Sequence, residues 1–210
     1  MSFFYLFLCF SLQAVSCTQE SLTHEALKAY VENGEYFRDV QKAVDDFSHR
    51  LEKLPALHHA LYKKAVIVDV DETLLTNVHY FAQVDYRPST KSFYDYLAHP
   101  QTTANEAVVR LVMRLQAQGY GIFIVTGRPQ RFCAITASQL TKIGLSEYYE
   151  QLFCNASDLD PVQYKQNVLS TLKGRGYDIV IHINDQCSEL ALGSIPMLVK
   201  LPNPFYNVQS

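Results

Sequence analysis

Three runs of consecutive apolar residues, most of them β-branched, limit what this chain of 210 residues can fold into more than any other feature. They occupy residues 65–68, 121–125 and 179–183, the last of which is apolar except for His182, and shorter candidate strands lie at 152–153 and 197–199. A strand that is apolar at every position is buried on both faces, which is typical of a parallel sheet covered by helices. The runs therefore predict the strands of a central parallel sheet.

Helical patterns fill the stretches between these runs. Residues 105–118, 130–143 and 162–173 carry apolar residues at helical spacing, and each of these segments is followed at once by a glycine. A glycine directly after a helical pattern is a typical C-terminal cap. The alternation of strands and helices predicts an α/β fold, with a Rossmann-like core and right-handed crossovers.

Two segments fall outside this alternation. Residues 18–62 are expected to form a helical extension, because apolar residues from Phe37 to Leu54 recur at spacings of three and four. Residues 77–103 follow the first strand and are rich in tyrosine and phenylalanine. Because ligands bind beyond the strand ends of such sheets, we interpret this segment as a small cap inserted over the site. The sequence thus predicts one domain over residues 18–210.

Polar residues that can carry chemistry come directly after the predicted strands, or begin the helix between two of them: Asp69, Asp71, Thr126, Gly127, Lys165 and Asp185. Asp69 and Asp71 point to the same side of an extended chain, because they are two residues apart. Two such carboxylates repel each other, and a hard divalent cation such as Mg²⁺, with Asp185 as a further oxygen ligand, relieves the repulsion.

A cation beside a lysine, a hydroxyl group and main-chain amides suits a dianion such as phosphate. Each of these motifs is common when it occurs alone, as a pair of acids, a strand-to-helix turn or a solvated lysine. Their order along the chain places them all at the carboxyl edge of one sheet. The sequence therefore predicts one metal site that handles phosphate.

Residues 66–77, VIVDVDETLLTN, resemble the first motif of the haloacid dehalogenase (HAD) superfamily. The DVDET form is similar to that of the DDDD-type acid phosphatases of subfamily IIIB, which include plant acid phosphatases and bacterial class C acid phosphatases. The resemblance runs from about Tyr30 to Leu201, and it includes VTGR at 125–128, Tyr164-Lys165 and GYDIVIHINDQCSEL at 176–190.

This resemblance implies roles for the matched residues. Asp69 corresponds to the nucleophile that becomes an aspartyl-phosphate, and Asp71 to the acid and base that serves the leaving group and then water. Thr126 and Gly127 correspond to groups that bind the phosphoryl oxygens, and Lys165 to the cation that neutralises their charge.

The resemblance also implies a resident Mg²⁺, which clamps the phosphoryl group. Its ligands would be Asp69, the main-chain carbonyl of Asp71, and Asp185, with Glu189 as a candidate outer-shell group. The implied function is a Mg²⁺-dependent acid phosphatase that hydrolyses phosphomonoesters, and a small-molecule phosphomonoester is the expected partner.

Three positions depart from the family pattern. Asn184 stands where a glycine is usual, Glu189 where the fourth aspartate is usual, and Leu169 where an arginine is frequent. These departures leave open a non-catalytic phosphate-binding or storage protein on the same fold. A second alternative is an intracellular HAD phosphatase such as a nucleotidase.

The start of the chain predicts export to the periplasm, the outer surface or the medium. Residues 1–17 are interpreted as a signal peptide, because residues 3–15 are almost entirely apolar and Ala14-Val15-Ser16 gives a small-x-small cleavage pattern. No basic residue precedes the apolar run, which is a departure from the usual pattern. Cys17 directly follows and is a candidate for a lipid anchor.

The other cysteines are compatible with two states. A disulfide among Cys133, Cys154 and Cys187 would fit an oxidising compartment, and buried free thiols are equally compatible with the sequence. Asn155-Ala156-Ser157 has the form of a glycosylation sequon.

Composition excludes several classes of protein. The 18 Lys and Arg against 21 Asp and Glu give a net charge of −3, which argues against a partner that is a nucleic-acid polymer. No apolar run reaches the ~18 residues of a membrane span, so an integral membrane protein is not expected. The sequence leaves a homo-oligomer open.

Overall fold

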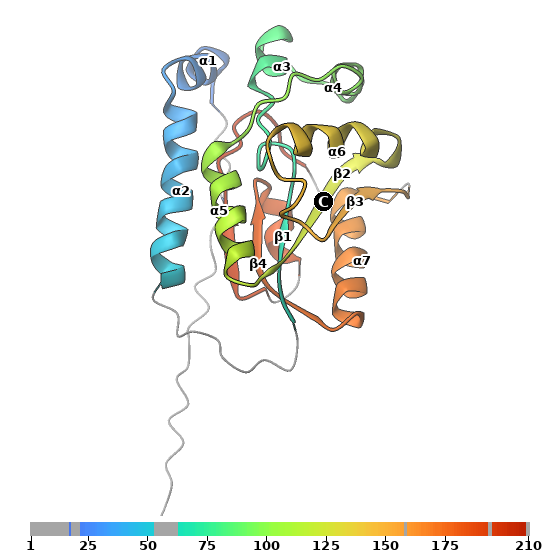
Figure 1. Cartoon of the computed structure of the whole chain (residues 1–210). Coiled ribbons are helices and arrows are strands. Elements are labelled where there is room, and N and C mark those ends of the chain that lie inside the picture. The colour runs from blue at the N-terminus through green and yellow to red at the C-terminus, as the bar shows by residue number, and fades with distance from the viewer. Residues whose placement is uncertain (1–16, 18–21, 53–62, 158, 193–194, 209–210) are drawn as a thin grey trace, which may run out of the picture.

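The computed structural model describes residues 17, 22–52, 63–157, 159–192 and 195–208, and Figure 1 shows their arrangement. A parallel sheet of five strands forms the centre, in the order β3-β2-β1-β4-β5. All five expected strands are confirmed: β1 (Lys63–Val68), β2 (Gly121–Pro129), β3 (Gln151–Asn155), β4 (Tyr177–Asn184) and β5 (Met197–Lys200). The α/β fold class is confirmed, and β1 is the central strand.

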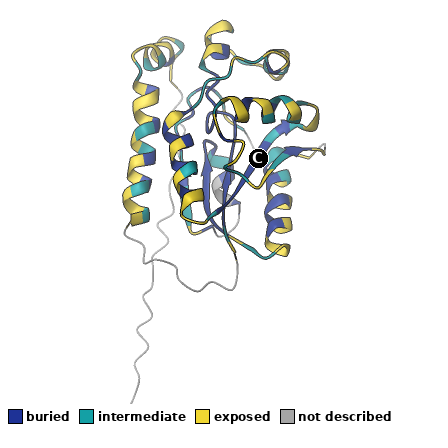
Figure 2. Cartoon of the chain, in the orientation of Figure 1, coloured by how far each residue is buried: buried dark blue, intermediate teal, exposed yellow. Residues whose placement is uncertain are grey.

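Helices cover both faces of this sheet. α2 (Glu35–Glu52) and α5 (Glu106–Ala117) lie on one side, and α7 (Pro161–Gly174) lies on the other (Figure 1). The valines of β1 pack into the cluster that contains α2 and α5, while Ala65 and Ile67 pack into the cluster that contains α7. Successive residues of β1 from Ala65 to Val68 face two buried layers, which explains why this part of the strand is apolar (Figure 2).

The N-terminal helices form a hairpin beside the sheet. α1 (His24–Glu32) begins at Thr23, whose side chain accepts the N–H of Ala26, and the turn to α2 contains Gly34 with a φ of 71°. α2 contacts α5 and β5, and it buries Tyr36 and Phe47 completely while its charged face remains exposed. Residues 53–62, the last part of the expected helical extension, lie outside the described residues.

Two short helices follow β1. α3 (Val78–Gln83) and α4 (Thr90–Leu97) lie beyond the carboxyl ends of the strands, at the top of Figure 1. Tyr80 joins them, because its ring lies 5.3 Å from that of Phe93 and 5.2 Å from that of Tyr96. This is the aromatic segment interpreted as a cap, and its role as a cap remains a prediction.

Two disulfides link segments near this end of the sheet. Cys133, the first residue of α6 (Cys133–Lys142), is bonded to Cys154 of β3. Cys17 is bonded to Cys187, which begins the short helix η2 (Cys187–Ala191). A lipid thioether would need the same sulfur, so this bond argues against the lipid anchor expected at Cys17. The rest of the expected signal peptide lies outside the described residues.

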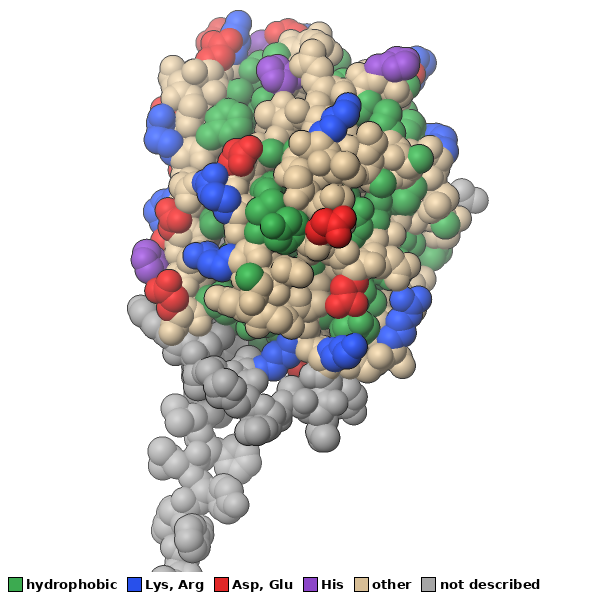
Figure 3. Space-filling view, in the orientation of Figure 1, with side chains coloured by type: hydrophobic (Ala, Val, Ile, Leu, Met, Phe, Trp, Pro, Cys, Tyr) green, Lys and Arg blue, Asp and Glu red, His purple; other side chains and the backbone are tan. Residues whose placement is uncertain are grey.

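The surface shows no segregation of charge on the face seen in Figure 3, where basic and acidic side chains are interspersed. None of the described helices is long and apolar enough to cross a membrane.

Candidate active site

A tight loop after β1 carries the first two carboxylates. The N–H of Asp69 donates to the carbonyl of Ile183 in β4 (3.0 Å), so the first residue of the loop is still hydrogen-bonded to the sheet. The chain then turns back, and the N–H of Leu75 donates to the carbonyl of Val70 (2.9 Å). Glu72 takes a φ of 50° within this turn, in the left-handed region that is costly for a residue with a side chain.

The buried carboxylate of Glu72 holds this turn closed. It accepts the main-chain N–H of Asn77 (2.7 Å), and the Asn77 amide donates to both Glu72 (3.2 Å) and Asp71 (2.8 Å). Burial raises the pKa of Glu72 well above its usual value. The strained turn thus fixes the direction in which Asp71 points.

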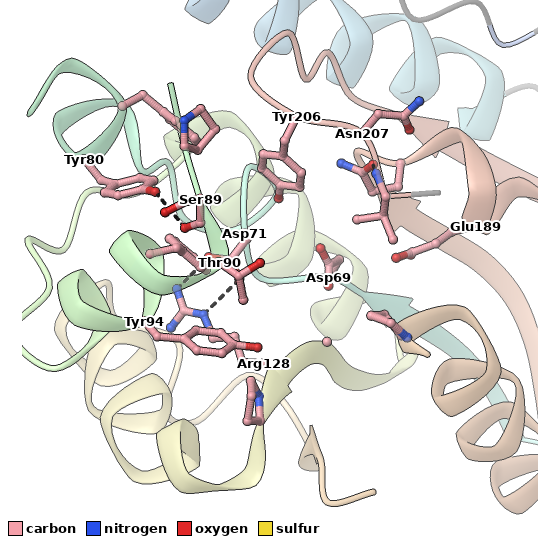
Figure 4. Close-up of a pocket in the computed structure, with 18 of the residues that line it drawn as sticks. Asp69, Asp71, Tyr80, Ser89, Thr90, Tyr94, Arg128, Glu189, Tyr206 and Asn207 are labelled. Carbon is pink, nitrogen blue, oxygen red and sulfur yellow. Dashed lines mark hydrogen bonds and ion pairs between the residues drawn. The ribbon is translucent and has the colours of Figure 1, made fainter. Parts of the chain in front are cut away.

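Residues from several strand ends line one cavity of about 380 Å³ (Figure 4). Its polar lining includes five of the residues singled out in the sequence: Asp69, Asp71, Gly127, Lys165 and Glu189. The two others, Thr126 and Asp185, are buried behind this lining, with at most 1% of their surface exposed. The expected convergence of the strand ends is therefore present in the structure, in two layers.

Lys165 forms the centre of the first group of charges. Its Nζ lies 2.8 Å from Oδ1 of Asp69 and 2.5 Å from Oε1 of Glu189, and all three side chains are buried. Burial would lower the pKa of Lys165, but the two carboxylates raise it above its usual value. The lysine therefore remains protonated and places a positive charge directly beside Asp69.

The pKa values of the two carboxylates beside Lys165 are shifted in opposite directions. Burial would raise the pKa of Glu189, but Lys165 and His182 outweigh it and lower this pKa to about 2. Burial raises the pKa of Asp69 well above its usual value, and Glu189 and Asp185 add to this increase. Lys165 lowers the pKa of Asp69 but does not outweigh burial, so further positive charge would stabilise the Asp69 carboxylate.

Arg128 at the end of β2 forms the second group. Its Nε and Nη2 donate to Oδ2 and Oδ1 of Asp71, at 2.9 and 2.7 Å (Figure 4). The remaining nitrogen, Nη1, donates to Thr136 Oγ1 (3.0 Å) and Gln139 Oε1 (2.7 Å), both on α6. Arg128 is only 3% exposed, so a buried fork with a bond from each of its three nitrogens holds the carboxylate of Asp71.

Thr126 keeps one hydrogen-bonding function free for a ligand. Its Oγ1 accepts the main-chain N–H of Arg128 (3.1 Å), and no described group is shown accepting its hydroxyl hydrogen. A phosphoryl oxygen is a suitable acceptor for that hydrogen. Gly127 beside it lines the cavity, and a Cβ there would come within 3.2 Å of Pro161, so a side chain at this position would crowd the opposite wall.

Asp185 supplies oxygen on the inner side of the site. Its Oδ2 accepts the amides of Gln186 and Asn203, both at 2.6 Å, whereas Oδ1 has only a long bond of 3.5 Å from Thr73. Burial raises the pKa of Asp185, with a further increase from Glu189. One oxygen of this carboxylate is therefore held firmly and the other remains available to a cation.

The donor set fits a hard divalent cation. Asp69 and Asp185 offer carboxylate oxygens, and their mutual repulsion would be relieved by added positive charge. Among the described residues no group of three His, Cys, Asp or Glu side chains is already gathered as a complete metal site. The residues thus fit Mg²⁺ by chemistry, and main-chain oxygen or water would have to complete its shell.

The departures from the family pattern have local explanations. Asn184 accepts the N–H of Gln186 through Oδ1 (3.0 Å), so its side chain closes the turn that presents Asp185. Leu169 is 4% exposed and packs in the apolar layer under α7, so its side chain serves packing and does not bind a charged group. Glu189 reaches Lys165 in spite of its longer side chain.

Two parts of the site were missed by the sequence analysis. Arg128 was noticed only as part of a turn, and its bonds to Asp71 require the geometry of β1 and β2 together. The segment after β5 was not considered, although Asn203 binds Asp185 and Tyr206 lines the cavity. Its signal was available: a polar and aromatic stretch, NPFYN, follows a strand whose carboxyl end faces the site.

A parallel sheet with an acidic loop after its central strand, and a buried lysine beside that loop, defines an α/β protein of the HAD type. Residues 8–209 match the family described as HAD superfamily, subfamily IIIB (Acid phosphatase), and the chain belongs to this family. The resemblance that the motifs indicated is thereby confirmed.

Known relatives and structures agree with this assignment. The chain is 29% identical to Vegetative storage protein 1 of Arabidopsis thaliana over 149 residues, which are 69% of this chain and 55% of that protein. It is 28% identical to Acid phosphatase 1 of Solanum lycopersicum over 150 residues, 68% of this chain and 58% of that protein. The chain thus spans just over half the length of these curated relatives.

The fold is shared with a class C acid phosphatase from Bacillus anthracis. The two structures align with a TM-score of 0.71 over 90% of this chain and 87% of that chain, at 16% sequence identity. At this identity the likeness concerns the fold.

Proposed function

We propose that this protein is an exported, Mg²⁺-dependent acid phosphatase that hydrolyses phosphomonoesters through an aspartyl-phosphate on Asp69. One observation carries the proposal. Asp69 and Asp71 lie in the wall of the same cavity, and each is bound by a different buried cation, Lys165 and Arg128. Two carboxylates with separate partners can take two different parts in one reaction.

In the first step an oxygen of Asp69 attacks phosphorus, and the bond from phosphorus to the ester oxygen breaks. The departing oxygen takes a proton from the carboxyl group of Asp71. Lys165 and the Thr126 hydroxyl stabilise the charge on the phosphoryl oxygens. Oδ2 of Asp71 accepts one bond, from Arg128, so this oxygen keeps a lone pair that can carry the proton while the bidentate pair stays intact.

In the second step Asp71 takes a proton from water, whose oxygen attacks phosphorus and releases Asp69. Arg128 holds the carboxylate of Asp71 in place through two hydrogen bonds while it acts as base. The bidentate pair therefore orients Asp71 for both steps. The products are an alcohol and inorganic phosphate, and both carboxylates return to their starting states.

Mg²⁺ held by Asp69, Asp185 and the main-chain carbonyl of Asp71 would supply charge to the phosphoryl group and keep Asp69 ionised. The last point matters because burial raises the pKa of Asp69 in the protein alone. Glu189 is already bonded to Lys165, so its part would be to hold this lysine in place.

Export is proposed from the cysteines as well as from the expected signal peptide. Cys133 and Cys154 form a disulfide outside the expected signal peptide, whereas Cys17 can keep its bond to Cys187 in an exported protein only if cleavage falls before Cys17. Disulfides persist in oxidising compartments and are rare in the cytosol. They favour an exported phosphatase over the intracellular alternative.

A storage or phosphate-binding protein is the alternative that the name of one relative suggests. Such a protein has no need of a nucleophile, nor of a buried acid held by a bidentate arginine. The intact Asp69 and Asp71 therefore favour an enzyme.

Hydrolysis of phenyl phosphate with Mg²⁺ and with chelator tests the proposal. We expect turnover that chelator abolishes and that Asp69→Asn lacks, while Asp178→Asn, an exposed acid at the other end of the sheet, retains it. If the wild-type protein does not turn over phenyl phosphate but still binds phosphate, the binding-protein alternative takes its place.

A further inference from the structure

A second cavity of about 460 Å³ adjoins the first. The two share four lining residues: Tyr94, Gly127, Pro129 and Pro161. Because Gly127 is placed beside the phosphoryl group, the second cavity opens directly from the reaction site. A substrate bound at Asp69 can therefore extend its leaving group into this space.

Arg131 is the only basic residue among the described residues that line this second cavity. Its guanidinium lies 4.8 Å from the ring of Tyr94 and 4.8 Å from that of Phe132. No ion pair with a described carboxylate is seen for Arg131, in contrast to Arg38 and Arg110 on the outer helices. It is a cation held in position by two rings, with nitrogens left for a ligand.

The walls around Arg131 are fixed relative to each other. One wall is the turn η1 (Gln130–Phe132), and the other is formed by residues 155–157, at the end of β3, together with Leu159. The disulfide Cys133–Cys154 joins the residues directly beside these walls. Tyr94, which comes from α4, lies next to Arg128 with its hydroxyl directed into the reaction cavity (Figure 4). The cavity is thus enclosed by residues from three separate elements of the fold.

We propose that this second cavity is a subsite for a second anionic group on the substrate, and that Arg131 binds it. The substrate class would be phosphomonoesters whose leaving group carries a carboxylate or a further phosphate. This inference rests on the proposed function, since it deepens the substrate class of the same site. A guanidinium suits both kinds of anion, because each offers paired oxygens to its fork.

Two matched substrates isolate the charge. 4-Carboxyphenyl phosphate and 4-carbamoylphenyl phosphate have nearly the same size and shape, and only the first carries a second anion. We expect the wild-type protein to prefer the carboxylate by about 2- to 5-fold in kcat/KM, as for a partly exposed ion pair. The preference should fall as salt is added, because salt screens exposed charges.

Substitutions of Arg131 test whether this residue causes the preference for the carboxylate substrate. Arg131→Gln should bring the ratio of the two kcat/KM values close to one, and Arg131→Lys should keep part of it. Arg175→Gln is the matched control, because Arg175 also lies over a ring, that of Phe153, but lines neither cavity. Its ratio should equal that of the wild type. A phosphonate in place of the carboxylate distinguishes the two anions, and a preference for either one supports the subsite.

Binding to Asp69→Asn protein separates this inference from the proposed function, because it needs no turnover. The Kd ratio of the two substrates should show the same preference, and it should vanish in Asp69→Asn/Arg131→Gln. If turnover is absent and the Kd preference is present, the proposed function fails and the subsite stands. If both substrates are turned over and bound equally by protein with Arg131 intact, the subsite is refuted.

Discussion

Arg128 and Asp71 form a bidentate ion pair at the carboxyl end of the sheet, with nitrogen–oxygen distances of 2.7 and 2.9 Å. The pair joins two strands, because Arg128 ends β2 and Asp71 follows β1. Its third nitrogen is bonded to α6, so the orientation of Asp71 depends on the packing of that helix. The proposed catalytic acid is in this way positioned by the core of the fold.

Replacing Arg128 should impair proton transfer more than substrate binding. In Arg128→Lys a point charge replaces the planar fork, so Asp71 keeps a cation but loses its orientation. We expect kcat to fall by about 100-fold, within the range of general acid–base catalysis, with KM little changed. The loss should be larger for an alkyl phosphate than for 4-nitrophenyl phosphate, whose leaving group scarcely needs a proton. An equal loss on both substrates would show that Arg128 acts otherwise.

Lys165 should be required for both stability and activity. Lys165→Met leaves Asp69 and Glu189 buried without their cation, and loss of one partner of a buried pair costs about 3–5 kcal/mol of unfolding free energy. Adding Glu189→Gln removes one of the two uncompensated charges and should recover part of this stability without restoring turnover. Chemical denaturation and phosphatase assays on both variants measure the two effects. Recovery of activity along with stability would contradict a catalytic part for Lys165.

Asn203 should set the affinity for Mg²⁺ through Asp185. Its amide holds Oδ2 of Asp185 at 2.6 Å, which leaves Oδ1 directed away for the cation. Residues that orient a metal ligand typically contribute 10- to 100-fold to affinity, and we expect Asn203→Ala to raise the half-saturating Mg²⁺ concentration by about that factor. Gln118→Ala, an exposed amide at the end of α5, is the control. Unchanged Mg²⁺ dependence in Asn203→Ala would remove this residue from the metal site.

The disulfide Cys133–Cys154 should stabilise the walls of the second cavity. It closes a loop across a sequence separation of 21 residues, for which loss of the bond corresponds to about 3 kcal/mol of unfolding free energy. The double variant Cys133→Ser/Cys154→Ser should show that loss in chemical denaturation while it keeps the reaction site assembled. A loss of less than 1 kcal/mol would indicate that the surrounding packing alone fixes these walls.

The arrangement of the strand ends could be predicted from the sequence because it follows from local pattern and topology. Apolar runs predicted β1, β2 and β4, and polar residues at their carboxyl ends had to meet at one edge of a parallel sheet. Asp69, Asp71 and Lys165 were found in this way before any geometry was known.

Contacts between distant side chains could not be predicted in the same way. The bond from Arg128 to Asp71 spans 57 residues, and only the register of β1 with β2 brings the two together. The Asn155 sequon shows that contacts between residues close in the sequence can be missed as well. Its side chain donates to the carbonyl of Leu159 and accepts from Ser157, so it is used within a turn and 9% exposed. A sequence motif gives no account of such local bonds.

Trapping the covalent intermediate tests the central claim most directly. Protein mixed with phenyl phosphate and Mg²⁺ is quenched in the steady state and treated with borohydride, which reduces an aspartyl-phosphate to homoserine. We predict that mass spectrometry finds homoserine at position 69, and that it is absent without substrate and in Asp69→Asn. Turnover with no modification at Asp69, or with the modification at Asp71 instead, would contradict the account.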